Sequence, residues 1–178
     1  LQGCPRLVLW RSVAQGRRTR LHQGRIMPTW KCTIPGYDLI SPNKLLRMKW
    51  FMQSKEKDRA MSLIAVYGRP IPQYHVPVAM AIVRKYGKRQ RKLDTDNLYG
   101  GCKLLVDAMK APKGRSKRGL SILMDDDPRS LDLWVTQAKN TEDSCDIEIY
   151  ACPATESLDL PDDVAMMFRQ SPVDRTAR

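Results

Sequence analysis

Carboxylates are concentrated in two short segments of a chain that is otherwise strongly basic. The first is the segment 94–98, Asp-Thr-Asp-Asn-Leu, and the second is the aspartate triplet 125–127. Two carboxylates held close together repel each other, so one of them becomes neutral unless a cation compensates. Mg²⁺ is such a cation, since it binds one or two carboxylates together with waters and a substrate phosphate. The two segments are therefore candidate ligands for a divalent metal that acts on phosphate.

The geometry of this candidate site depends on the elements expected around it. Residues i and i+2 of an extended segment point to the same side, so we expect Asp94 and Asp96 to project together. The apolar segment 122–124 is expected to form a short strand that ends at the triplet. Asp126 would then supply a third ligand from across the sheet, with Asp125 as its nearest competitor. The alternative for the first segment by itself is a solvated turn pair, and for the triplet it is an acidic turn that caps the element after it.

Phosphodiester hydrolysis is the chemistry that such a site could perform. A bound metal could activate a water and stabilise the leaving oxygen. Lys103, on the helix expected after the first segment, could offset charge that develops on the phosphate. Other chemistries have less support, because the chain contains no G-x-x-x-x-G-K-[ST] loop and its two histidines and five scattered cysteines form no nucleophilic or zinc-binding pattern. The cysteines instead indicate buried thiols in a reducing compartment.

The charge of the chain indicates the class of partner. With 31 Lys and Arg residues against 19 Asp and Glu, the 178 residues carry a formal net charge of +12. Such an excess favours a polyanion, most commonly nucleic acid, although a basic surface that serves only solubility is the alternative. We expect two basic segments beside the carboxylates, 84–92 and 113–118, to bind DNA phosphates without reading bases, together with the long helix predicted over 43–66. In the two segments, the candidate residues are Lys85, Lys88, Arg89, Arg91, Lys92, Lys113, Arg115, Lys117 and Arg118.

Hydrophobic periodicity predicts the elements that must position these residues. The predicted strands are 30–34, 76–83, 131–135 and 147–150, the last two paired as a hairpin across 140–144, and the predicted helices are 43–66 and 98–109. Gly100 and Gly101 fall within the second helix, where we expect them to form a flexible start or to let DNA approach closely. No apolar run approaches the about 20 residues that a membrane span needs.

The two ends of the chain differ from its centre in composition. Residues 1–28 contain six arginines and no acidic residue, and we expect this basic extension to be disordered, with 1–26 outside the folded domain. Residues 29–151 carry the periodic pattern of a folded domain. Residues 152–178 are acidic and are expected to form a largely disordered tail, with a short helix at 164–168.

The motifs together resemble the RusA family of Holliday junction resolvases of bacteria and their phages. The matching residues are Ser41-Pro42-Asn43, Asp94-Thr-Asp96-Asn97-Leu98, Lys103, Asp107-Ala108 and Leu123-Met-Asp125-Asp126. Their order and approximate spacing fit the family over about residues 29–150. The chain departs from the family pattern at Tyr99-Gly-Gly101, which lengthens the segment before Lys103, and in the long basic loop 111–119.

The resemblance implies a specific fold and activity. It implies an α+β fold with a small mixed β-sheet and two main helices, and a homodimer in the bacterial or phage-infected cytoplasm. It implies Mg²⁺- or Mn²⁺-dependent nicking of two opposed strands of a four-way DNA junction in recombination and repair, with no nucleotide cofactor. The family's essential residues would fall on Asp94, Asp96, Lys103 and Asp126. The alternative is a non-catalytic branched-DNA- or RNA-binding protein of the same fold.

Overall fold

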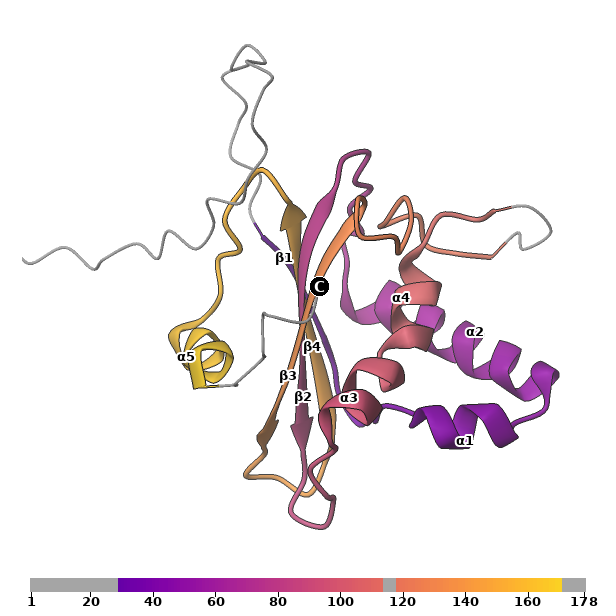
Figure 1. Ribbon diagram of the computed structural model, residues 1–178, viewed down its shortest axis with the longest axis vertical. Coiled ribbons are helices and arrows are strands. Elements are labelled where there is room, and N and C mark those ends of the chain that lie inside the picture. Colours follow the sequence, from indigo (N-terminus) through magenta and orange to yellow (C-terminus); the bar gives the residue numbers. More distant parts are fainter. Residues whose placement is uncertain (1–28, 114–117, 171–178) are drawn as a thin grey trace, which may run out of the picture.

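The computed structural model describes residues 29–113 and 118–170, which form a mixed sheet flanked by helices (Figure 1). The strands are β1 (Trp30–Ile34), β2 (Val78–Tyr86), β3 (Leu131–Lys139) and β4 (Asp146–Pro153). The helices are α1 (Pro42–Arg47), α2 (Trp50–Tyr67), α3 (Thr95–Gly101), α4 (Lys103–Met109) and α5 (Asp162–Gln170). The basic extension 1–28 lies outside the described residues. None of the described helices is long and apolar enough to cross a bilayer.

The four strands follow the order β1-β4-β2-β3, so the sheet is mixed and the fold is α+β, which agrees with the fold class that the resemblance implies. β2 runs parallel to β3 and antiparallel to β4, and β1 runs antiparallel to β4. The predicted hairpin of the last two strands is wrong, because β2 lies between them. Met80 of this central strand has Leu133 on one side and Ala151 on the other.

Both faces of the central strand are covered. Val78, Met80 and Ile82 face a core formed with α2 and α4, whereas Ala81 and Val83 face a smaller cluster formed with α5. This alternation is the two-residue period of a strand whose two faces are both buried. Figure 1 accordingly shows α1 to α4 on one side of the sheet and α5 on the other.

The long helix predicted over 43–66 is divided into α1 and α2. Met48 and Lys49 adopt extended conformations, with ψ of 138° and 145°, so the chain turns between the two helices. The Gln53 side-chain amide donates to the carbonyls of Leu45, at 2.8 Å, and Met48, at 3.1 Å. It thereby satisfies acceptors that the end of a helix leaves free. The corner between α1 and α2 is therefore held by a specific contact.

The helix predicted over 98–109 starts earlier and is interrupted at Cys102, giving α3 and α4. The two glycines allow close packing of helices. A Cβ on Gly100 would overlap Cγ of Pro42, and one on Gly101 would lie 3.0 Å from Cβ of Leu39. These glycines therefore let α3 approach α1 and the preceding loop, and the structure gives them this role rather than that of a flexible start.

The C-terminal part differs from the largely disordered tail that the sequence predicts. β4 extends to Pro153, beyond the expected boundary at residue 151. The predicted short helix is part of the longer α5, and Val164 of α5 is buried against the sheet. Residues 152–170 are thus part of the folded domain, while 171–178 lie outside the described residues.

Candidate functional site

The first acidic segment forms the beginning of α3. Asp94 is the N-cap, and its two carboxylate oxygens accept from the backbone N–H of Asn97, at 2.8 Å, and from its side-chain amide, at 2.7 Å. These bonds hold the pKa of Asp94 below its usual value. Asp96 is exposed in the first turn. The predicted extended geometry is therefore wrong for this pair, because aspartate is a strong N-cap and starts the helix here.

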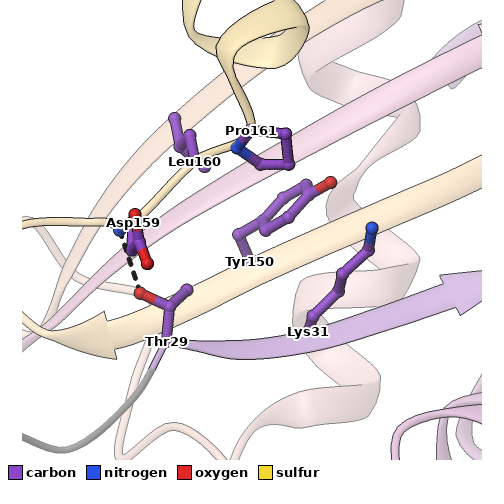
Figure 2. Close-up of a pocket in the computed structure, with 6 residues that line it drawn as sticks. All are labelled: Thr29, Lys31, Tyr150, Asp159, Leu160 and Pro161. Carbon is purple, nitrogen blue, oxygen red and sulfur yellow. Dashed lines mark hydrogen bonds between the residues drawn. The ribbon is translucent and has the colours of Figure 1, made fainter. Parts of the chain in front are cut away.

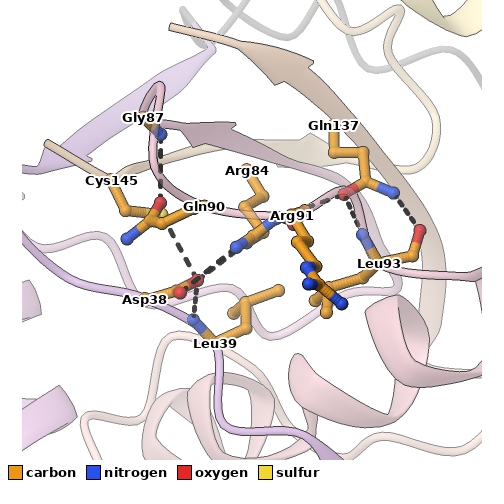
Figure 3. A network of polar contacts seen from close by, with 9 residues as sticks. All are labelled: Asp38, Leu39, Arg84, Gly87, Gln90, Arg91, Leu93, Gln137 and Cys145. Carbon is orange, nitrogen blue, oxygen red and sulfur yellow. Dashed lines mark hydrogen bonds and ion pairs between the residues drawn. The ribbon is translucent and has the colours of Figure 1, made fainter. Parts of the chain in front are cut away.

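A buried network fixes the loop that leads to Asp94 (Figure 3). Arg84 is only 2% exposed and forms a bidentate ion pair with Asp38, with nitrogen–oxygen distances of 2.7 and 3.1 Å. The same guanidinium donates to the carbonyl of Arg91 at 3.1 Å and to Oε1 of Gln137 at 3.3 Å. Sequence reasoning missed this role, because Arg84 stands at the start of a basic run that reads as a solvated surface.

Gln137 of β3 completes the network at the residue before the N-cap. Its Oε1 accepts from the Leu93 N–H at 3.0 Å, and its Nε2 donates to the Leu93 carbonyl at 2.5 Å. Both backbone polar groups of Leu93 are thus held by one side chain of the sheet. Asp94 is consequently tied to the C-terminal half of β3.

The aspartates of the second acidic segment, 125–127, form ion pairs and hydrogen bonds with residues near the end of α4 and the start of β3. Lys110 at the end of α4 places Nζ 2.6 Å from Asp107 and 3.0 Å from Asp126, so one ammonium bridges two carboxylates. Asp125 pairs with Lys113. Asp127 accepts from the backbone N–H groups of Arg129 and Ser130 and shapes the turn before β3. The predicted strand 122–124 is only a single bridge between Leu123 and Lys110.

The structure does not bring the two acidic segments together within one copy. Leu93 is bound at Gln137, whereas Asp127 lies at the start of β3, beside Leu131. Six residues of strand separate these points, which corresponds to about 20 Å at 3.3 Å per residue. Among the described residues, no three His, Cys, Asp or Glu side chains form a group that could hold a metal ion. The expectation that Asp126 joins Asp94 is therefore not met in a single chain.

Lys103 is exposed at the first position of α4. It follows Asp96 by seven residues, or about 10 Å along a helix axis. A pocket of about 260 Å³ lies at the far end of α4, beside the second acidic segment. Its lining contains four basic and two acidic side chains, from Lys57, Asp107, Lys110, Lys113, Arg118 and Asp125. Three of its four cations pair with carboxylates: Lys110 with Asp107, Lys113 with Asp125 and Arg118 with Asp58.

The predicted phosphate-binding residues differ in whether their side chains already form ion pairs within the protein. Lys88, Arg91 and Lys92 are exposed in the loop before Asp94. Lys85 is engaged by the buried Glu148 at 2.9 Å, and Arg89 has only a long contact to Asp143, at 3.8 Å. Lys113 pairs with Asp125 and Arg118 with Asp58, whereas Arg115 and Lys117 lie outside the described residues. The loop 88–92 is therefore the stronger of the two predicted phosphate-binding segments.

A second pocket, of about 340 Å³, lies on the opposite face of the sheet beside α5 (Figure 2). Thr29, Lys31 and Tyr150 line it together with residues 159–161. The Asp159 N–H donates to Thr29 Oγ1 at 2.9 Å, which fastens the segment before α5 to the start of β1. None of the candidate site residues lines this pocket, so we assign it no part in the candidate site.

The described cysteines are buried free thiols, as the sequence predicts. Burial raises the pKa of Cys102 to about 12 and that of Cys32 to about 11, so neither is a thiolate at neutral pH. No family model and no curated protein matches this chain. Its function must therefore be proposed from its own residues.

Proposed function

We propose that this protein is a structure-selective DNA endonuclease that resolves four-way junctions by metal-dependent phosphodiester hydrolysis, in recombination and repair. The observation that supports it most is the start of α3. There, exposed Asp94 and Asp96 directly follow a loop with the exposed cations Lys88, Arg91 and Lys92. Basic side chains that hold a phosphate beside carboxylates that hold a metal are the elements this reaction needs.

Mg²⁺ or Mn²⁺ is compatible with this segment. Such hard cations bind one or two carboxylates and complete their coordination with waters and substrate phosphate. Asp94 and Asp96 would provide the carboxylates, and the lowered pKa of Asp94 keeps it ionised. When bound, the metal would supply an activated water and charge stabilisation at the leaving oxygen. Asp126 and Asp125 do not fit the same set in one copy, since they lie most of a strand away, where they pair with Lys110 and Lys113.

The remaining roles in the proposal belong to the chain itself. Lys88, Arg91 and Lys92 bind the backbone of the cleaved strand without reading its bases. The network of Arg84 and Gln137 holds the loop so that Asp94 keeps its position relative to the sheet. A homodimer would present two copies of the segment to two opposed strands, as symmetrical cleavage requires.

A second candidate function is non-catalytic binding of branched DNA or RNA. It is favoured by the separation of the two acidic segments and by the protein partner that each aspartate of 125–127 already has. Both functions predict binding that weakens steeply with salt. Cleavage alone distinguishes them.

The test uses a synthetic four-way junction with one labelled strand, incubated with the full chain in Mg²⁺, Mn²⁺ or EDTA. We expect paired nicks near the branch point only with metal. Asp96→Asn should bind the junction normally and fail to nick it. Asp132→Asn, a matched loss of an exposed carboxylate on β3, should nick normally. Tight binding with no nicking by the wild-type chain in either metal would instead establish the non-catalytic function.

A further inference from the structure

The corner between α1 and α2 exposes several large apolar side chains, of the kinds that are buried elsewhere in the protein. Leu46 is 82% exposed and Trp50 is 81% exposed, and Phe51 stands edge-on to the Trp50 ring with centroids 6.3 Å apart. Tryptophan is among the residues that proteins bury most heavily on average. An indole that is mostly exposed to solvent therefore indicates a surface that binds another molecule.

The backbone that carries the Trp50 ring has a defined conformation. Met48 and Lys49 are extended, and the two bonds from Gln53 tie the end of α1 to the first turns of α2. Trp50 is the first residue of α2 and follows this turn directly. The Trp50 side chain is thus exposed on an ordered turn that hydrogen bonds hold in place.

The corner is also strongly cationic. No Asp or Glu occurs between Asp38 and Glu56. Four basic side chains of this interval are exposed, all within six residues of Trp50 in the sequence, namely Lys44, Arg47, Lys49 and Lys55. Glu56 itself is engaged by Arg59 at 3.7 Å. Charge complementarity therefore favours an anionic binding partner. The exposed indole further favours a partner that has a flat apolar group.

We propose that this corner binds nucleic acid that has an unstacked base, with Trp50 stacking on the base and the four cations on the flanking phosphates. Every nucleobase has a face that an aromatic ring can cover, but in a continuous duplex these faces are already stacked. Branch points and single strands expose them. The proposal deepens the proposed function by naming the feature of the substrate that is recognised, and it requires no cleavage.

Two other occupants fit the corner less well. An anionic membrane surface is bound by helices whose apolar residues continue along a face for several turns. Here the exposed apolar group, which also includes Met52, is confined to the corner. After Met52, α2 next exposes large apolar side chains at Val66 and Tyr67, at its other end. A second copy of the chain in a two-fold contact would place the same four cations against each other, which is repulsive.

The experiment compares Trp50→Ala with wild type on three probes in EDTA: a short oligothymidylate, an abasic oligomer of equal length, and a continuous duplex. Loss of one base–aromatic stack should weaken oligothymidylate binding about 5- to 150-fold. Binding of the abasic oligomer and the duplex should be unchanged. Trp50→Phe should retain most of the affinity. Tyr67→Ala, which removes an aromatic side chain 47% exposed at the far end of α2, is the matched control and should bind as wild type.

The salt dependence provides a second readout. Trp50→Ala should shift the plot of log affinity against log salt without changing its slope, because stacking releases no counterions. Lys49→Ala should lower the slope by about 0.7 on a single strand. The proposal is overturned if Trp50→Ala weakens all three probes equally, or leaves oligothymidylate binding intact. It is also overturned if the variant's defect is loss of self-association or of anionic-vesicle binding. Because no metal is present, failure of the endonuclease proposal would leave these results unaffected.

Discussion

The substitution Asp38→Asn tests how the buried network supports the candidate site. Asp38 is the carboxylate partner of Arg84, whose side chain is 2% exposed. The variant keeps the size of the side chain and removes its charge, so it leaves a guanidinium in the protein interior without its counter-ion. Arg84 also holds the carbonyl of Arg91, two residues before Leu93. Both the stability of the domain and the order of the loop 87–93 should therefore change.

The expected loss of stability follows from the burial of the pair. Removing one partner of a buried ion pair costs about 3–5 kcal/mol. The Asp38 side chain is 40% exposed, so water reaches the outer side of the pair. We therefore lower the expected loss to about 2–3 kcal/mol in the free energy of unfolding. At about 3 °C per kcal/mol for a domain of this size, Tm should fall by about 6–9 °C.

The pH dependence of this loss has a defined sign. Burial by itself would raise the pKa of Asp38, but hydrogen bonds and charge from Arg84 outweigh it and hold the pKa below its usual value. A carboxylate with a lowered folded pKa stabilises the protein fully above its unfolded pKa of about 3.9. That contribution is lost as pH falls through the lower folded pKa. The gap between wild type and Asp38→Asn should thus be complete at neutral pH and should close in acid.

The measurement is urea unfolding of both chains at several pH values, with Asp132→Asn as the control for loss of a solvated carboxylate. Amide hydrogen exchange at Leu93 is the local readout, and it should quicken in Asp38→Asn beyond the change in core strands. Equal stability of wild type and Asp38→Asn at neutral pH would refute the assigned role of the pair. A gap that persisted undiminished in acid would refute the electrostatic origin of the loss.

Three further outcomes are expected from packing. Gly100→Ala should lower the free energy of unfolding by about 1–2 kcal/mol in thermal or urea melts, despite alanine's higher helix propensity, because its Cβ would overlap Pro42; an equal or higher Tm would contradict this. Val164→Ala should cost about 2 kcal/mol and make the segment 154–161 more sensitive to limited proteolysis, since α5 loses its buried anchor; an unchanged cleavage rate would show that α5 is held otherwise. Burial raises the pKa of Cys102 and Cys145 to about 12, so mass-spectrometric mapping should find their thiols unalkylated in the native protein at mildly alkaline pH and alkylated after denaturation; rapid native labelling would contradict their burial.

Local sequence patterns located the four strands of the sheet, although the predicted strand 122–124 is only a single bridge and the predicted hairpin of the last two strands is wrong. The predicted strand 30–34 coincides with β1, and Val78, Met80 and Ile82 lie on one face, as their spacing indicates. The same spacing reaches Arg84, which therefore points toward the core side instead of joining the solvated basic run. That signal was present in the sequence. Its partner Asp38, 46 residues earlier in the chain, was not predictable from spacing.

Other features depended on choices that periodicity does not contain. At the break between α1 and α2, the side-chain amide of Gln53 donates to the carbonyls of Leu45 and Met48 at the end of α1. Periodicity does not predict this contact. Asp94, expected as an extended metal ligand, is instead the N-cap of α3, because its carboxylate accepts from the backbone N–H of Asn97 three residues later. The pairing of β2 between β3 and β4 joins residues more than 50 positions apart. Such long-range pairings depend on how all the core side chains pack together, which the local sequence pattern does not contain.

The distance between the two acidic segments is a consequence of topology. β2 and β3 are parallel neighbours, so the chain that leaves the end of β2 must return along the sheet before β3 can begin. Asp94 stands at the start of this return path, where α3 begins, and Asp126 stands near its end, after α4. Any sequence with this connection would separate the two positions by most of a strand. A metal site in one copy is therefore limited to the carboxylates at one end, and a third aspartate from the far end would have to come from a second copy, such as the proposed homodimer contains.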